Sequence, residues 1–239
     1  MAIAPPSRPA TSKTAGPAWR AYLPGAAGVA YVVAWAAGLA VWPVNLALNA
    51  TAGQVAASYR AHPAEASVQY LLIEGLAGVL LGIVLACELR AARDRAADDR
   101  AARVHAGTRA TGPAVLSAIA VLTSLTQCVI GLFITAAATS GHIASCGTLS
   151  DLVNRLDGVK MLALVGATAW IAATGPALPR WLRGVTVALG LALIASGYAY
   201  LALSSALAWT AYVSGPLLLL WVGSAGIALT VTARRRARL

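Results

Sequence analysis

Hydrophobic residues occur in long continuous stretches, which are separated by shorter segments rich in charged and small polar residues. About 20 helical residues cross the hydrocarbon core of a bilayer, so each stretch of that length predicts one membrane-spanning helix. The pattern therefore predicts an all-α fold, a polytopic transmembrane helix bundle. Its six predicted spans are residues 24–46, 69–88, 113–139, 159–176, 185–207 and 211–232.

The composition supports this class. Of the 239 residues, 59% are hydrophobic and only 11% are charged, whereas soluble domains carry about 25% charged residues. The net charge of +10 is also typical of nucleic-acid-binding proteins. However, the basic residues lie between the apolar stretches, where they set membrane topology. We therefore expect no nucleic acid partner, and the predicted partners are the lipid bilayer and an amphiphilic small-molecule substrate.

The basic residues are distributed unequally between the two sides of the predicted bundle. Of the 18 Lys and Arg residues, all but Arg60, Arg155 and Lys160 fall on one side. The positive-inside rule then predicts a multi-pass protein of the cell membrane with both termini in the cytoplasm.

The two ends of the chain differ in composition from the predicted transmembrane domain at residues 24–232. Residues 1–23 are rich in Pro, Ser, Thr and Ala, which predicts a disordered cytoplasmic tail, and residues 233–239 predict a basic cytoplasmic tail. A basic region before an apolar stretch is also typical of a cleaved signal peptide. This apolar stretch exceeds the usual length of roughly 7–15 residues, which favours an uncleaved signal anchor.

The segment between spans two and three, residues 90–110, combines strong helix formers with opposite charges three and four residues apart. This pattern predicts a solvated helix that continues span two and places its arginines against anionic lipid headgroups. A docking site for a partner is the alternative interpretation.

Two segments on the other side, residues 47–68 and 140–158, look like polar linkers, and we expect part of each to lie as a short helix on the membrane interface. The second contains "TLSDLVNRLDG", in which Ser150 or Thr148 is a helix start signal and Gly158 is a stop signal. We expect a short helix here that folds over the outer mouth of the bundle. The very short connection at 207–211 predicts a tight hairpin of spans five and six.

The second span contains a carboxylic acid, Glu74, set among leucines, glycines and alanines within "QYLLIEGLAGVLLGIVLACEL". A charged side chain at the bilayer centre costs on the order of a few kcal/mol. Burial favours the protonated form of a carboxyl group, so Glu74 is a candidate general acid, with the Tyr70 phenol one turn away as its hydrogen-bond partner. In the alternative interpretation, Glu74 is a packing contact that bonds to a hydroxyl or amide on another helix.

Aromatic and amide side chains provide candidates for lining an outward-facing cavity near Glu74. Several aromatic residues lie too deep for the interfacial belt, namely Trp35, Trp170, Tyr198 and Trp221, whereas Trp42 and Tyr70 are also ordinary belt residues. Gln127 has the alternative role of joining two helices. The candidate substrate-binding residues are Tyr70, Trp35, Trp42, Asn45, Gln127, Trp170, Tyr198, Tyr200 and Trp221.

Metal and cofactor motifs are missing from the sequence. Cys87, Cys128 and Cys146 form no Cys-x-x-Cys pair, and their spacing to the three histidines matches no metal-ligand pattern. There is also no HExxH motif and no aspartate-rich diphosphate-binding motif. We predict no metal ion and no cofactor.

The order of several segments resembles a broad group of small bacterial six-span proteins that carry a domain-of-unknown-function label. The segments are "AGVAYVVAWAAGLAV", "ATAGQVAASYR", "LLIEGLAG", "LTSLTQCVIGLF" and "GPALPRWLRGVTVALGLALIASGYAYL". The resemblance implies that Glu74, Gln127 and the Leu178–Arg180 turn occupy recurring positions, with Gly184 one residue later than in the group. It implies a fold and little about activity. The Ala, Arg and Gly bias looks like an actinobacterial genome.

Three functions remain open. The favoured one is a metal-independent membrane enzyme acting on an isoprenoid-type substrate, in which Glu74 protonates an alkene or epoxide and aromatic faces stabilise the carbocation. Small integral membrane terpene cyclases are similar at this coarse level. The second is a proton-coupled transporter, exporter or immunity protein, which the apparent lack of other ionisable residues in spans three to six disfavours. The third is a structural or regulatory subunit.

Overall fold

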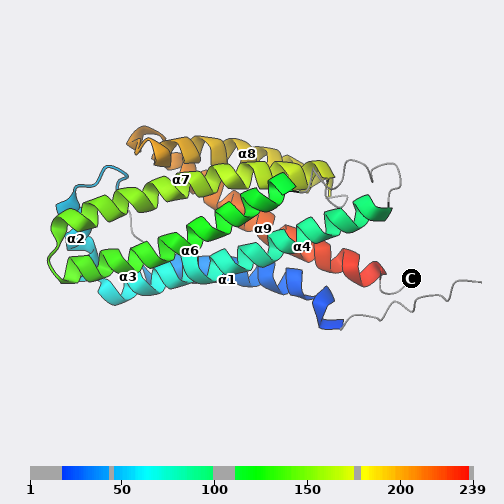
Figure 1. The fold of residues 1–239 in the computed structure, drawn as a ribbon, viewed down its shortest axis with the longest axis horizontal. Coiled ribbons are helices and arrows are strands. Elements are labelled where there is room, and N and C mark those ends of the chain that lie inside the picture. Colours follow the sequence, from blue (N-terminus) through cyan, green and yellow to red (C-terminus); the bar gives the residue numbers. More distant parts are fainter. Residues whose placement is uncertain (1–17, 43–45, 99–110, 175–178, 237–239) are drawn as a thin grey trace, which may run out of the picture.

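The computed structural model describes residues 18–42, 46–98, 111–174 and 179–236, and every secondary-structure element among them is helical. Six of these helices are long and apolar enough to cross a membrane, which confirms the predicted number of spans. Five are single α-helices: α1 (Leu23–Val41), α6 (Thr111–Thr139), α7 (Ile143–Thr174), α8 (Arg180–Leu201) and α9 (Ala211–Arg236). The sixth is composite, and Figure 1 shows all of them aligned along one long axis.

The composite span joins three consecutive elements, α3 (Pro63–Tyr70), the π-helix η2 (Leu71–Leu76) and α4 (Ala77–Asp98). The helix continues well beyond residue 88, as the charge pattern predicted, although residues 99–110 lie outside the described part of the chain. The π-turn is the irregular feature of this span. It inserts an extra residue per turn, and such insertions are frequent at functional sites.

The outside of the bundle carries large apolar side chains. Leu122 and Phe133 on α6 are 63% and 61% exposed, and Val187 and Leu191 on α8 are each 66% exposed. Such a surface is unfavourable in water, since soluble proteins rarely expose large apolar patches. It is the surface expected of helices that face lipid.

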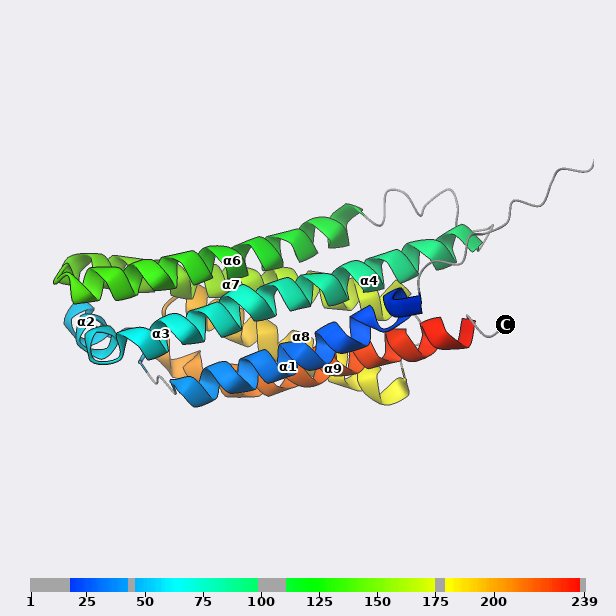
Figure 2. The same ribbon diagram turned by 90° about the horizontal axis from the view of Figure 1, so that it is seen from below.

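The first and last spans pack closely side by side (Figure 2). The backbone N–H of Gly25 donates to Thr230 Oγ1 at 2.9 Å, and a Cβ at Gly28 would lie 2.9 Å from the carbonyl oxygen of Val222. Small residues at these positions let the two backbones approach, as in other membrane helix pairs. The start of α1 and the end of α9 therefore lie at the same end of the bundle.

The structure corrects the prediction for residues 140–158. They do not form a linker with a short helix that stops at Gly158, because α7 begins at Ile143 and continues without a break to Thr174. Gly158 is a contact point with α8, since a Cβ there would lie 2.7 Å from the carbonyl oxygen of Gly197. As a result, Asp157 and Lys160 belong to the interior of the fourth span.

The fifth span is also displaced from its predicted bounds of 185–207. Pro179 precedes the first turn of α8, and the helix ends at Leu201. A 3-10 turn, η3 (Ser205–Thr210), then leads directly into α9. The predicted hairpin of spans five and six is present, and the Ser196 hydroxyl holds it together through bonds of 3.0 Å to the Thr210 and Ser214 hydroxyls.

A short amphipathic helix, α2 (Ala52–Ala61), covers the end of the bundle opposite the start of α1 and the end of α9 (Figure 1). Thr51 and Gln54 form a capping box at its start. Its buried face belongs to a second apolar core with Trp42, Ile134 and Cys146. The covering helix thus comes from residues 47–68, and Trp42, only 7% exposed, is a core residue and not part of an interfacial belt.

Candidate functional site

The centre of the bundle contains a group of polar side chains on three spans, which we call the charge cluster: Glu74, Ser124, Gln127, Asp157 and Lys160. Glu74 projects from the π-turn and is the buried residue of that turn, at 9% exposure. Lys160 lies near the midpoint of α7 and is 8% exposed. Lys160 was counted with Arg60 and Arg155 among the outer basic residues, although it lies at the start of the predicted span 159–176. In the structure it is a buried residue in the middle of a longer helix, so that count was wrong.

Lys160 joins the two acidic residues. Its Nζ lies 3.0 Å from Glu74 Oε1, 2.8 Å from Glu74 Oε2 and 2.7 Å from Asp157 Oδ1. An ammonium group has three N–H donors and no acceptor. Oxygens of both carboxylates therefore lie within hydrogen-bond distance of the Lys160 ammonium, which is the arrangement that stabilises a buried positive charge.

Two side chains of α6 complete the network. The Ser124 hydroxyl donates to Glu74 Oε2 at 2.5 Å. Gln127 Nε2 donates to the Val153 carbonyl oxygen at 3.0 Å and to Asp157 Oδ1 at 3.3 Å. Since both partners of Gln127 are acceptors, its amide orientation is determined, and the other atom, Oε1, is buried without a hydrogen-bond partner in the described structure.

The cluster carries an excess of acidic groups. Two carboxylates and one ammonium give a net charge of −1 when all three are ionised. Buried ion pairs are stable only when their charges are balanced and their lone pairs are satisfied. The site therefore favours uptake of one further positive charge, either a proton or another small cation.

Three tyrosines on other helices lie within electrostatic reach of the cluster. Tyr31 on α1 is 2% exposed and interacts electrostatically with Lys160, Glu74 and Asp157. Tyr200 on α8 and Tyr70 on α3 are electrostatic neighbours of both acidic residues as well. Neutral hydroxyl groups thus surround the charges on several sides.

The structure brings Tyr70 close to Glu74 but gives its hydroxyl a different partner from the predicted one. The Tyr70 hydroxyl lies 2.7 Å from the Tyr59 hydroxyl of α2, and the Tyr70 ring packs directly on Gly131. The expected bond between the Tyr70 phenol and the Glu74 carboxyl group is therefore wrong. Glu74 instead bonds to a hydroxyl on another helix, Ser124, as the alternative interpretation proposed.

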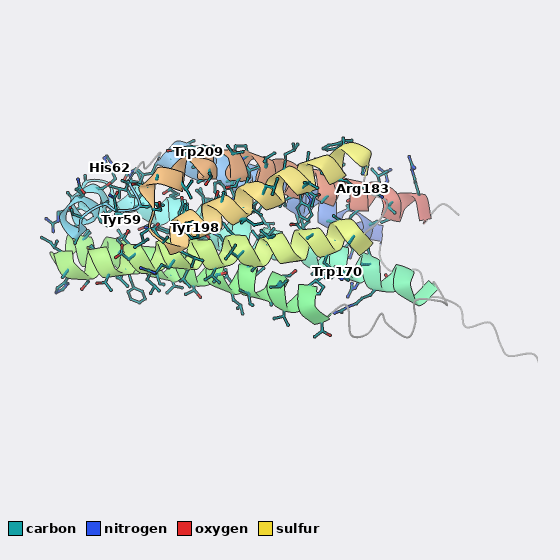
Figure 3. All side chains as sticks on the ribbon, turned by 90° about the horizontal axis from the view of Figure 1, so that it is seen from above. Tyr59, His62, Trp170, Arg183, Tyr198 and Trp209 are labelled. Carbon is teal, nitrogen blue, oxygen red and sulfur yellow. The ribbon has the colours of Figure 1, made fainter. Side chains whose placement is uncertain are left out.

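The other predicted lining residues do not converge on one cavity wall. Tyr198 is 62% exposed, so the prediction that it lines the bundle interior is wrong. Trp221 is fully buried, and its indole N–H donates to Thr186 Oγ1 at 3.0 Å. Trp35 and Trp170 are half-buried against the main core. Figure 3 places Trp170 and Tyr198 at different levels along the bundle, and Asn45 lies outside the described residues.

The sequence contained a signal for the three cluster residues that were not among the predicted site residues, Ser124, Asp157 and Lys160. Ser124 and Gln127, and likewise Asp157 and Lys160, are three residues apart, which places each pair on one face of its helix. The polar segment from 140 to 158 concealed this, because Gly158 resembles a helix stop signal. No protein-family model matches the chain, and neither does any curated protein or solved structure.

Proposed function

We propose that this protein is a proton-coupled membrane transporter in which the charge cluster is the coupling site. The observation that carries the proposal is the presence of two carboxylates and one ammonium in hydrogen-bond contact inside the spans. Ionisable residues inside membrane spans are costly and mark ion or proton pathways. The lack of such residues in spans three to six was the main reason to disfavour transport, and Asp157 and Lys160 remove that reason.

The cluster also provides a way to couple proton binding to movement. Its members come from the composite span, from α6 and from α7, so a change in charge alters bonds between three helices. A ligand shifts a conformational equilibrium only through different interactions with the two states. Uptake of a proton weakens the attraction of one carboxylate to Lys160. A proton therefore binds with different free energies to a state in which this contact is formed and a state in which it is broken.

The isoprenoid cyclase hypothesis receives less support from this geometry. A general acid must present its own O–H group to the substrate. Both carboxyl oxygens of Glu74 instead accept hydrogen bonds from Lys160, and Oε2 also accepts one from Ser124. Two of the aromatic residues expected to stabilise a carbocation are not placed to do so, because Tyr198 faces outward and Trp221 lies in the packed core. The cyclase hypothesis therefore stays a prediction, with less support than the transporter hypothesis.

The proposed orientation places both termini in the cytoplasm and α2 outside the cell, in the cell membrane. The distribution of basic residues supports it, and removal of Lys160 from the outer count strengthens the asymmetry. On that side Arg60 and Arg155 remain. The cluster would then exchange protons with the exterior from beneath the covering helix.

The test is transport by proteoliposomes under an imposed pH gradient, recorded by solid-supported membrane electrophysiology with a panel of organic cations, organic anions and amino acids. We expect at least one solute to move in response to the gradient. Glu74→Gln should abolish the gradient dependence, because the substituted cluster is neutral without a proton. The matched control, Glu65→Gln, changes a carboxylate of the same span with a 47% exposed side chain and should transport normally. Gradient-driven movement by Glu74→Gln at the wild-type rate contradicts the proposal, as does a wild-type protein that moves no solute of the panel.

A further inference from the structure

The hydrogen bonds of the charge cluster are divided unequally between the two carboxylates. Glu74 accepts bonds on both oxygens, one on Oε1 and two on Oε2. Asp157 forms an ion pair with Lys160 and accepts a hydrogen bond from Gln127, and both contacts involve Oδ1. Asp157 Oδ2 has no hydrogen-bond partner among the residues that the structure describes. Within the cluster, Asp157 therefore has the open acceptor.

The exposure of the two acidic side chains also indicates that Asp157 is the more accessible of the two. The Asp157 side chain is 18% exposed, against 12% for Glu74 and 10% for Lys160. A second open acceptor, Gln127 Oε1, is held close by, since Nε2 of the same amide bonds to Asp157. Buried carbonyl oxygens of this kind are normally satisfied by protein or by ordered water. Two acceptors without a donor indicate a place for a water molecule or a hydronium ion.

From these observations we infer that Asp157 Oδ2, and not Glu74, is the atom that takes up and releases the coupling proton, with Gln127 Oε1 holding the water that delivers it. The inference rests on the proposed function only in one respect, namely that the proton drives the transport of a solute. Proton uptake by Asp157 itself does not require that a solute moves. In the uptake step a hydronium ion passes its proton to Oδ2, one O–H bond forms, and the hydronium leaves as water. The cluster then contains one carboxylate and one ammonium and is neutral.

Lys160 is not the group that exchanges the proton. Its ammonium contacts oxygens of both carboxylates, and loss of its charge would leave two carboxylates facing each other without a counter-ion. The other titratable groups facing the cluster are neutral hydroxyls and a thiol: Tyr31 from α1, Tyr70 from α3, Cys128 from α6 and Tyr200 from α8. None of them supplies a charge that balances the excess carboxylate.

The test is infrared difference spectroscopy of the full-length protein in lipid, titrated from neutral to acidic pH. A protonated carboxyl group has a C=O stretching band that a carboxylate lacks, and the frequency of the band differs between aspartic and glutamic acid. We expect one titrating band from the cluster. Asp157→Glu should move its frequency while keeping the charge count, whereas Glu74→Asp should leave the frequency unchanged. Asp157→Asn should remove the band. The matched control Asp151→Asn changes an exposed carboxylate of the same helix and should retain it.

Each alternative outcome has a defined meaning. A band whose frequency follows Glu74→Asp assigns the proton to Glu74 and overturns the inference while leaving the proposed function intact. The absence of any cluster band overturns the inference as well. A band that follows Asp157→Glu in a protein without gradient-driven transport supports the inference and contradicts the proposed function. Because the two charge-conserving variants keep a carboxylate available to Lys160, we expect their folding to be less affected than that of Asp157→Asn.

Discussion

The ammonium of Lys160 lies 2.8 Å from Oε2 of Glu74, and this pair connects residues 86 positions apart in the chain. It joins α7 to the π-turn of the composite span, and the Asp157 contact one turn earlier makes it a three-member group. The energetic consequences of removing one member differ sharply from those of removing two, because charge balance dominates at buried sites.

We predict that Lys160→Met destabilises the protein by about 3–5 kcal/mol, the range expected when one partner of a buried ion pair is removed. Two carboxylates would remain without a counter-ion. The measurement is the midpoint of unfolding by denaturant in detergent micelles. Arg183→Met, which removes an exposed basic residue of α8 (labelled in Figure 3), is the control and should change the midpoint little.

A double variant distinguishes charge balance from packing. Glu74→Gln combined with Lys160→Met leaves one carboxylate, so it should recover part of the stability lost in Lys160→Met alone. If instead the stability lost in the double variant equals the sum of the losses in Glu74→Gln alone and Lys160→Met alone, the two residues make no specific contribution as a pair. The ionic interpretation of the cluster would then be wrong.

Gly158 is predicted to tolerate no side chain. Gly158→Ala places its Cβ 2.7 Å from the Gly197 carbonyl oxygen and 2.7 Å from Leu201 Cγ, so α8 must move away from α7. We expect a loss of about 1–3 kcal/mol, as for other overpacked sites. The unfolding midpoint measures it.

The matched control for that substitution is Gly190→Ala on α8, where a Cβ meets nothing within 4 Å. Alanine is the better helix former, by up to about 1 kcal/mol, so this variant should be neutral or stabilised. Equal losses in the two variants would show that backbone propensity, and not the α7–α8 contact, determines the effect.

The sequence predicted the parts of this fold that depend on the average polarity of a segment. Six apolar stretches gave six spans, and the start of the last span, Ala211, agrees with the prediction. Glu74 was singled out because its polarity contrasts with that of its neighbours. Of its two partners on other helices, Ser124 matches the alternative interpretation, a hydroxyl or amide, because a buried carboxyl group must have some partner. The favoured partner, Tyr70, was wrong, and Lys160 was not predicted.

The parts that depend on tertiary contact were not predictable. Lys160 follows the polar segment 140–158, so it was counted among the outer basic residues at the edge of the predicted span 159–176. Its burial becomes favourable only when Glu74, far away in the chain, comes within 3.0 Å. Gly158 likewise has two meanings, a helix stop or a close helix contact, and only the approach of Gly197 decides between them. Tyr198 and Tyr200 are two residues apart on one helix, so the exposure of Tyr198 and the partial burial of Tyr200 depend on where α7 packs.

The contact of α2 with the composite span should weaken at alkaline pH. Burial raises the pKa of Tyr59 above its usual value, with further effects from Tyr70 and Cys146. A group whose pKa is raised on folding contributes stability that is present below its unfolded pKa, about 10 for tyrosine, and is lost as the pH rises through the folded value. We expect the melting temperature of the wild-type protein to fall above about pH 10.

The variant Tyr59→Phe tests this dependence. At neutral pH it should be less stable by about 1 kcal/mol, because the Tyr70 hydroxyl loses its partner. This difference from wild type should narrow as the pH rises, since phenylalanine does not ionise. Tyr198→Phe, at an exposed position, is the control and should follow the wild-type profile. A constant difference between Tyr59→Phe and wild type at every pH contradicts the assignment.

The proposed orientation predicts which residues are accessible from outside the cell. Gly53 in α2 and Gly112 at the start of α6 lie at opposite ends of the bundle, and a Cβ at either position meets nothing within 4 Å. Cysteine at these positions should therefore be tolerated. In intact cells a membrane-impermeant maleimide should label Gly53→Cys, whereas Gly112→Cys should react only after permeabilisation. The unsubstituted protein provides the background, because Cys128 and Cys146 are buried and Cys87 is partly buried. If only Gly112→Cys is labelled in intact cells, the orientation is the opposite of the proposed one. Protons would then enter the charge cluster from the cytoplasmic side.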